Sequence, residues 1–335
     1  MRSLLLAALV LAPAAALAQT AAPQTHFETV YSDAQKAADQ DLSRRFITGV
    51  LAPSLSFENQ YAKWNRGICP NVLGLSATAK YVLERRIRDV ATQVHAPVDR
   101  EDPCLPNITI IVTPQPQATL DSIAAIAPYL VIGGKQRQLT VTHPIQSWYT
   151  TFRRDFSGLA QLDLPWEDRA TASGGATGVD PGLTATDPNV GVDGGVIGNT
   201  MGGINVQVTN SIERDIPRVV GQGTRLSTGI TAEMAGVVII VDSKAIMGMS
   251  LGSLGDYAAF LSLAQAPVTG RCQEAPTIAN LMAQGCATDV KTSNLSNVDI
   301  AMLTGLYDTP EKPEMLQRPR IIGAMRRTLE SQFTH

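Results

Sequence analysis

Histidine is scarce in this 335-residue sequence, and the scarcity limits the metal chemistry that the chain can perform. No two of its four histidines are four residues apart; they are His26, His95, His143 and His335. A catalytic zinc ion needs three protein ligands and a base beside the bound water. A motif that supplies them, such as H-E-x-x-H, is absent. The sequence therefore predicts neither a metal site nor a cofactor.

An excess of positive charge is also missing. The formal net charge is −3 at pH 7, so electrostatics gives no reason to expect a nucleic-acid partner. The basic cluster at residues 85–88 is flanked by Glu84 and Asp89, which is typical of a solvated helix face. After the first 18 residues, no apolar run approaches the roughly 20 residues that a membrane-spanning helix needs. We expect no transmembrane segment in the mature chain.

Nucleophile motifs are missing as well. There is no G-x-S-x-G, and Ser250 is better interpreted as a helix cap than as a catalytic serine. His143 is the best remaining candidate for chemistry, although a hydrogen-bonded histidine on a strand is the favoured interpretation. Paired carboxylates could serve a glycosidase, and four are available: Glu233, Asp242, Asp256 and Asp299.

The N-terminus has the pattern of an export signal. A basic start, Met1-Arg2, precedes an apolar run from Leu4 to Leu11, and Ala16-Leu17-Ala18 is an A-x-A cleavage site. The sequence predicts a signal peptide at 1–18 and a mature protein that is periplasmic or secreted. We expect a flexible lead-in at 19–45, followed by a single domain at 46–335.

The four cysteines fall into two local pairs. Export supplies an oxidising compartment, where an even cysteine count indicates disulfides. Four cysteines allow three connectivities, and the local one, Cys69–Cys104 with Cys272–Cys286, is favoured because short loops close at least entropic cost. A zinc site is the competing interpretation, but the sequence has no C-x-x-C and no histidine near a cysteine.

Helix and strand patterns alternate without a regular βαβ rhythm, which predicts an α+β fold with a mixed sheet and packed helices. Strands are expected at 107–113, 204–212 and 234–242, with an extended stretch at 139–151. Helices are expected after Ser76 and Ser250, at 121–127 and 276–282, and from a capping box formed by Ser296 and Asp299. Glu84 and Arg88 are spaced for an ion pair on the first helix.

A glycine-rich segment interrupts this pattern. Residues 173–203 hold ten of the 27 glycines, which predicts a long flexible loop. A weak Ca²⁺ site formed by Asp180, Asp187 and Asp193 is the alternative, but the calcium-binding nonapeptide is out of register and does not repeat.

The order of the expected elements resembles that of zincin-type metalloproteases. The closing segment Leu295–Tyr307, with L-S-x-x-D-I and L-Y, is similar to the last helix of matrixin-like proteases. The resemblance implies that Leu251–Gln265 takes the place of their metal-binding helix. That helix here has neither histidine nor glutamate, so no ligand or base of the family can be assigned.

The chain also resembles a group of uncharacterised exported bacterial proteins, whose activity is unknown. This similarity rests on five segments: 68–70, 106–108, 144–149, 225–242 and 256–259. The missing metal ligands favour a non-catalytic binding or envelope-associated module on a degenerate zincin-like scaffold, whose partner is an unknown envelope component or a small ligand. The alternative is an extracytoplasmic hydrolase with a carboxylate site or one centred on His143. Candidate groove residues are Trp64, Arg66, His143, Trp148, Tyr149, Asp256 and Tyr257.

Overall fold

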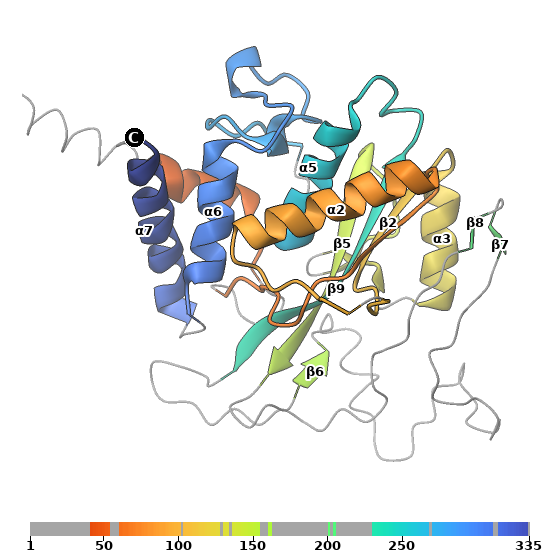
Figure 1. The fold of residues 1–335 in the computed structure, drawn as a ribbon, viewed down its shortest axis with the longest axis horizontal. Helices are drawn as coiled ribbons and strands as arrows, with labels where there is room; N and C mark the ends of the chain where they lie inside the picture. Colours follow the sequence, from red (N-terminus) through yellow and green to blue (C-terminus); the bar gives the residue numbers. More distant parts are fainter. Residues whose placement is uncertain are drawn as a thin grey trace, which may run out of the picture. The chain divides into compact units, whose positions relative to one another are not determined.

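The computed structural model (Figure 1) describes residues 41–53, 60–101, 103–127, 130–133, 136–154, 160–162, 200–201, 204–205, 230–267, 270–310 and 314–333. The predicted signal peptide, residues 19–40 of the predicted lead-in and the three aspartates of the calcium alternative lie outside these ranges. The glycine-rich segment also lies outside them, apart from residues 200–201.

A mixed five-stranded sheet forms the centre of the fold (Figure 1). Its order is β1 (Pro70–Leu73), β2 (Ile108–Thr113), β9 (Thr231–Asp242), β5 (Ile145–Arg154) and β6 (Ala160–Leu162). The first three strands are parallel, whereas β5 runs antiparallel to β9 and to β6. Two further pairs are β3 (Ile132–Gly133) with β4 (Gln136–Arg137) and β7 (Thr200–Met201) with β8 (Ile204–Asn205). The predicted α+β class with a mixed sheet is confirmed.

The middle strand β9 is covered on both faces. Val237, Ile239 and Val241 contribute to the main hydrophobic core, and Val238 and Ile240 to a smaller second core. Successive side chains of a strand point to opposite faces, so an unbroken apolar run is what a strand buried on both sides requires. The sequence predicted this central strand correctly.

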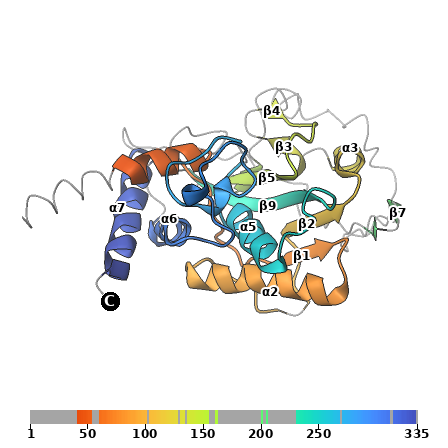
Figure 2. The same cartoon turned by 90° about the horizontal axis from the view of Figure 1, so that it is seen from above.

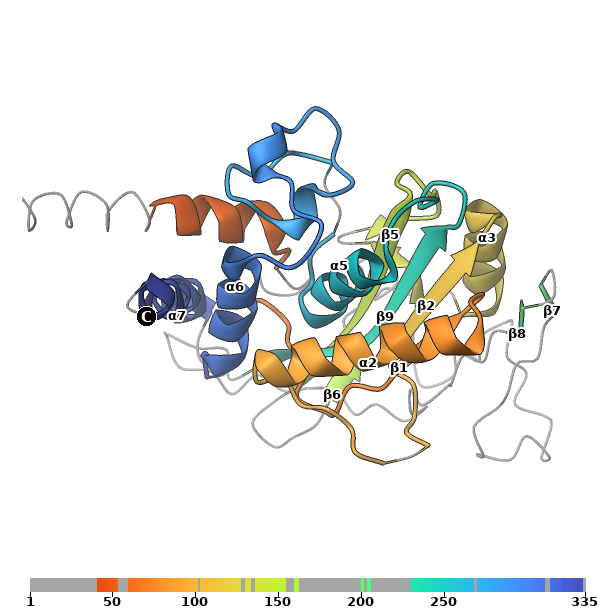
Figure 3. The ribbon, with the colours of Figure 1, turned by 45° about the horizontal axis from the view of Figure 1, so that its top comes forward.

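Two long helices cover one face of the sheet. They are α2 (Ala77–Gln93) and α5 (Leu251–Leu263), which lie side by side in Figure 3. Each begins at the predicted serine cap: Ser76 Oγ accepts a hydrogen bond from the amide of Ala79, and Ser250 Oγ from that of Ser253. Gly255 permits their close contact, because a Cβ there would lie 3.1 Å from Cγ of Arg86.

Helix α3 (Pro116–Ile126) lies on the opposite face, together with β3 and β4 (Figure 2). It packs Leu120 and Ile123 into the second core. The sequence placed this helix at 121–127, with Pro116 as a strand stop. Proline is favoured in the first helical turn, where its missing N–H is not needed, and the helix therefore begins at Pro116.

The C-terminal part adds α6 (Asn297–Asp308) and α7 (Glu314–Phe333). Ser296 and Asp299 form the predicted capping box at the start of α6. Gly305 brings the two helices together, because a Cβ there would lie 2.9 Å from the carbonyl oxygen of Ile321. Gln317 of α7 accepts a hydrogen bond from the amide of Tyr61 at 2.7 Å and donates one to its carbonyl at 3.0 Å.

Other local predictions differ from the structure. Residues 41–45, predicted as part of the flexible lead-in, belong to a helix at 41–50 that buries Phe46 and Ile47. The helix predicted at 276–282 is only a short 3₁₀ turn, η2 (Ile278–Asn280), and a second one, η3 (Thr288–Val290), follows. The predicted strand at 204–212 is described only at β8. Across the described ranges, no helix is long and apolar enough to cross a bilayer.

The predicted pair of Glu84 with Arg88 does not form. Glu84 instead accepts a hydrogen bond from the amide of Val72 at 3.0 Å and lies 3.6 Å from Nζ of Lys80. Arg88 points toward the sulfur of Cys104, at 3.9 Å. The Glu84 carboxylate therefore binds the backbone of β1 and not Arg88 of its own helix.

Both predicted disulfides are formed, Cys69–Cys104 and Cys272–Cys286. The second closes part of the segment between α5 and α6. Asn280 organises the same segment: its amide nitrogen donates to the carbonyls of Gln273 and Val290, both at 2.9 Å, and its oxygen accepts from the amide of Gln273 at 2.7 Å. This ordered segment forms one wall of the candidate site.

Candidate functional site

Helix α5 carries one carboxylate, Asp256, and both of its oxygens accept hydrogen bonds from neighbouring elements. Asp256 is only 1% exposed. One of its oxygens is paired with the guanidinium of Arg86 on α2. The other accepts hydrogen bonds from the side chain of Asn294 and the amide of Leu295, both at 3.1 Å. Asp256 therefore ties α5 to α2 and to the chain before α6, and does not face a groove.

Tyr149 and Tyr257 are the two predicted candidates that the structure brings together. Tyr149, on β5, packs beneath the end of α5, and its hydroxyl lies 3.0 Å from the carbonyl of Leu261 and 3.2 Å from that of Ala266. It also accepts a hydrogen bond from Ser147 Oγ at 2.9 Å. Burial raises the pKa of Tyr149, and these hydrogen bonds oppose the rise only in part.

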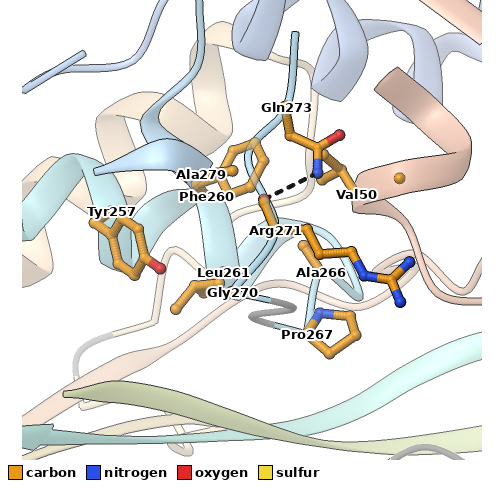
Figure 4. A pocket seen from close by; sticks show the side chains of 11 residues that line it. Val50, Tyr257, Phe260, Leu261, Ala266, Pro267, Gly270, Arg271, Gln273 and Ala279 are labelled. Carbon is orange, nitrogen blue, oxygen red and sulfur yellow. Dashed lines mark hydrogen bonds between the residues drawn. The ribbon is translucent and has the colours of Figure 1, made fainter. Parts of the chain in front are cut away.

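Tyr257 has no such partners. Burial raises the pKa of its hydroxyl, and the nearby Tyr149 raises it further, whereas no hydrogen bond contributes. Within the described part of the chain, the hydroxyl of Tyr257 makes no hydrogen bond. It faces a pocket beside α5, where Figure 4 shows it pointing toward the other lining side chains.

This pocket lies between the helix at 41–50, the second half of α5 and the segment that leads to η2. Its cavity volume is about 20 Å³, which is room for about one water molecule, and the pocket is partly open to solvent. Besides Tyr257, it is lined by Gly49, Val50, Phe260, Leu261, Ala266, Pro267, Gly270, Arg271, Gln273 and Ala279. Small residues leave the space open, and Phe260, Leu261 and Pro267 give it apolar walls.

Polar groups stand at the side of the pocket away from Tyr257. Gln273 donates a hydrogen bond to the carbonyl of Arg271 at 3.4 Å, which fixes the turn there. The guanidinium of Arg271 extends away from Tyr257 in Figure 4. The pocket therefore has a tyrosine hydroxyl at one end and polar side chains at the other, with apolar surface between them.

The remaining predicted candidates do not contribute to this pocket. Trp64 is buried, and its indole donates to the carbonyl of Ser262 at 2.7 Å. Trp148 is buried in the second core, on the opposite face of the sheet from Tyr149. Arg66 is exposed, and its guanidinium lies 5.9 Å from the ring centre of Phe152. Both tryptophans are core residues, and Arg66 makes a cation–π contact.

His143 lies outside the pocket, near its edge. Nδ1 is 2.8 Å from the hydroxyl of Thr142, and the backbone amide donates to Gln146 at 3.3 Å. On the other side, Nε2 faces Gly270, where a Cβ would come within 3.2 Å of it. The sequence favoured a hydrogen-bonded histidine on a strand; His143 is hydrogen-bonded but lies in a bend just before β5, and none of its partners among the described residues is a carboxylate.

The four carboxylates considered for hydrolysis are not paired with one another. Glu233 is held by Arg154 at 2.7 Å, and Asp242 accepts from the amide of Lys244 at 2.9 Å. Asp299 caps α6 and accepts hydrogen bonds from Thr277 and the amide of Ile278. Among the described residues, no group of three histidine, cysteine, aspartate or glutamate side chains could hold a metal ion.

Several pocket residues had no recognisable signal in the sequence. Gly49 and Val50 belong to a helix at 41–50 whose first half was predicted as flexible, and Gln273 and Ala279 lie in an irregular disulfide-bonded segment. Only Phe260 and Leu261, beside Tyr257 on α5, could have been inferred from helical spacing. No protein-family model, curated protein or solved structure matches the chain.

Proposed function

We propose that this chain is an exported, non-catalytic binding protein on a scaffold with a zincin-type order of elements. The scaffold is proposed from the sequence resemblance. The order of the elements supports it, because β9 leads into α5, a disulfide-bonded segment follows, and α6 comes next. The N-terminal export pattern and the two disulfides support a location outside the cytoplasm.

The environment of Asp256 carries the proposal. A zincin places its metal ligands and general base on the helix that α5 replaces. Asp256 is the only acidic side chain on α5, and Arg86, Asn294 and Leu295 occupy both of its oxygens. Its neighbours Leu254, Ala258 and Leu261 are apolar and buried. This helix therefore acts as a packing element beside a small pocket.

The test is a metal and turnover assay of the mature chain, purified without chelator. Elemental analysis should find well under one equivalent of zinc. A panel of peptide and glycoside substrates should give no turnover above buffer, with a zinc peptidase at equal concentration as the positive control. One equivalent of zinc, or cleavage that a chelator abolishes, would overturn the proposal.

A further inference from the structure

The solvent-facing side of α7 is rich in arginine. The other side packs against α6 and carries the buried residues Gln317, Ile321, Ile322, Ala324 and Met325. In Figures 1 and 2, α7 forms one edge of the described chain, with α6 on its inner side. Helical spacing places five residues together on the outer side, namely Pro319, Arg320, Gly323, Arg326 and Arg327. We call these five residues the arginine face.

The arginine face carries positive charge without matching acidic groups. Arg320 and Arg327 are exposed, and within the described ranges no acidic side chain forms an ion pair with either of them. From Gln317 to Leu329 the sequence has four arginines and no acidic residue, and a single glutamate, Glu330, follows. The whole chain has a formal net charge of −3, so this face is opposite in sign to the rest of the molecule. Such an asymmetry orients a protein toward an anionic surface.

The two exposed arginines converge on one part of this face. Two helical turns, about 10 Å along the axis, separate Arg320 from Arg327, and Gly323 lies between them. A Cβ at Gly323 would lie 3.6 Å from a terminal guanidinium nitrogen of Arg327, so this guanidinium reaches back along the helix toward Arg320. Arg318, in contrast, donates a hydrogen bond to the hydroxyl of Tyr61 at 2.9 Å and belongs to the packing of α7.

The composition of the face indicates the class of partner. A guanidinium is weakly hydrated and binds phosphate through two parallel hydrogen bonds. The core of a protein–protein interface is apolar and rich in aromatic side chains. Among the α7 side chains that the structure describes, no large apolar one is exposed. The phosphate layer of a bilayer requires no apolar contact, because it attracts each cationic side chain near its surface.

We propose that the arginine face binds the phosphate layer of a bilayer that contains anionic lipids, with Arg320 and Arg327 as the principal contacts. This inference rests on the proposed function for the location outside the cytoplasm, and it names the surface with which an envelope-associated module associates. The binding is peripheral, because Ile321, Ile322 and Met325 of α7 are packed in the main core and do not reach the bilayer.

Co-sedimentation with vesicles tests the class of partner. The mature chain should bind vesicles of phosphatidylglycerol and phosphatidylcholine in equal parts, and should not bind vesicles of phosphatidylcholine alone. Binding should be lost in about 1 M salt, where the Debye length is about 3 Å. Absence of binding to the anionic vesicles at low salt, or equal binding to both kinds of vesicle, would overturn the inference. Tighter binding to polyglutamate than to the anionic vesicles would also overturn it, and would identify an acidic polypeptide as the partner.

Two double variants test the location. Arg320→Gln with Arg327→Gln should weaken binding to the anionic vesicles about 20-fold, because each cation near the surface contributes about fivefold. The control, Arg85→Gln with Arg100→Gln, makes the same change in net charge at exposed residues outside α7 and should leave binding nearly unchanged. Thermal melts of both variants establish that they fold. An equal loss of binding in the two variants would show that net charge, and not the arginine face, determines the affinity.

The vesicle experiment is independent of the test of the proposed function. Absence of vesicle binding would remove the lipid partner and leave a non-catalytic exported protein. Turnover or one equivalent of zinc, which co-sedimentation does not measure, would instead contradict the proposed function.

Discussion

The guanidinium of Arg86 on α2 is paired with the carboxylate of Asp256 on α5, and this ion pair joins the two helices that cover one face of the sheet. Asp256 is buried, whereas the Arg86 side chain is 39% exposed. The pair lies beside Gly255, where a Cβ would come within 3.1 Å of Cγ of Arg86. The contacts of Asp256 therefore join α5 to α2 and to the chain before α6.

Replacing this carboxylate should reduce stability. Asp256→Ala leaves Arg86, Asn294 and the amide of Leu295 without their shared acceptor. We expect the free energy of unfolding to fall by about 3 kcal/mol, near the low end for a broken buried pair because Arg86 is partly solvated. Urea denaturation measures this. The control is Asp89→Ala, which removes the exposed pair with Arg85 and should cost at most about 0.5 kcal/mol.

The two disulfides should differ in their contributions to stability. Cys69 and Cys104 are 35 residues apart, and Cys272 and Cys286 are 14 apart. Restriction of the unfolded chain grows with loop length, so losing the first bond should cost about 4 kcal/mol and losing the second about 3 kcal/mol. Denaturation of the two double Cys→Ala variants compares them. Non-reducing peptide mapping should recover both pairs, and a Cys69–Cys272 peptide would contradict the connectivity.

Removal of the hydroxyl should affect stability differently at Tyr149 and at Tyr257. Tyr149→Phe removes the acceptor of Ser147 Oγ and the hydroxyl beside the carbonyls of Leu261 and Ala266, and it should cost about 1–3 kcal/mol of stability. Tyr257→Phe removes a hydroxyl that has no described partner and should leave stability unchanged or raise it by up to about 1 kcal/mol. Thermal or urea unfolding without ligand checks both. A large loss in Tyr257→Phe would show that its hydroxyl supports the fold.

Asp299 should make stability depend on pH. Burial raises its pKa above the ordinary value, and the hydrogen bonds from Thr277, Ile278 and Ser296 offset only part of that rise. The folded state therefore holds this proton more tightly than the unfolded state. The contribution is fully present below the unfolded pKa of 3.8 and is lost as the pH rises through the folded value.

The Asp299→Asn variant isolates this effect. Unfolding free energies of both proteins, measured from mildly acidic to neutral pH, should differ by an amount that changes in this window. Relative to the variant, the unsubstituted protein should lose stability as the pH rises. A constant difference across the range would show that Asp299 has the same pKa in both states.

Local signals in the sequence predicted much of the fold. Three helices begin at a serine, namely Ser76, Ser250 and Ser296. The serine oxygen accepts a hydrogen bond from a free amide of the first turn, and this stabilises the helix start whatever the helix packs against. The apolar run of β9 indicated a strand with two buried faces. Both disulfides were predicted from the cysteine spacing and the N-terminal export pattern. These predictions depend on interactions within short stretches of chain, which a single sequence contains.

The sequence did not predict features that depend on residues far apart in the chain. Helix α7 contains Pro319, which is unfavourable inside a helix, and it is stabilised by packing against α6 and by contacts of Gln317 and Arg318 with Tyr61. The pocket combines elements that are far apart in sequence. Trp64 and Trp148 were proposed for a ligand surface because of their chemistry, but tertiary packing places both in the core.

The double hydrogen bond between Gln317 and Tyr61 determines when folding can finish. The partners are 256 residues apart, and β9 reaches its neighbour β2 only after more than a hundred intervening residues. A polypeptide that emerges N-terminus first therefore holds β1 and β2 without their central strand until late in its emergence. Helix α7 must therefore arrive before Tyr61 can make these two hydrogen bonds. The chain can therefore complete its fold only after almost all of it has emerged.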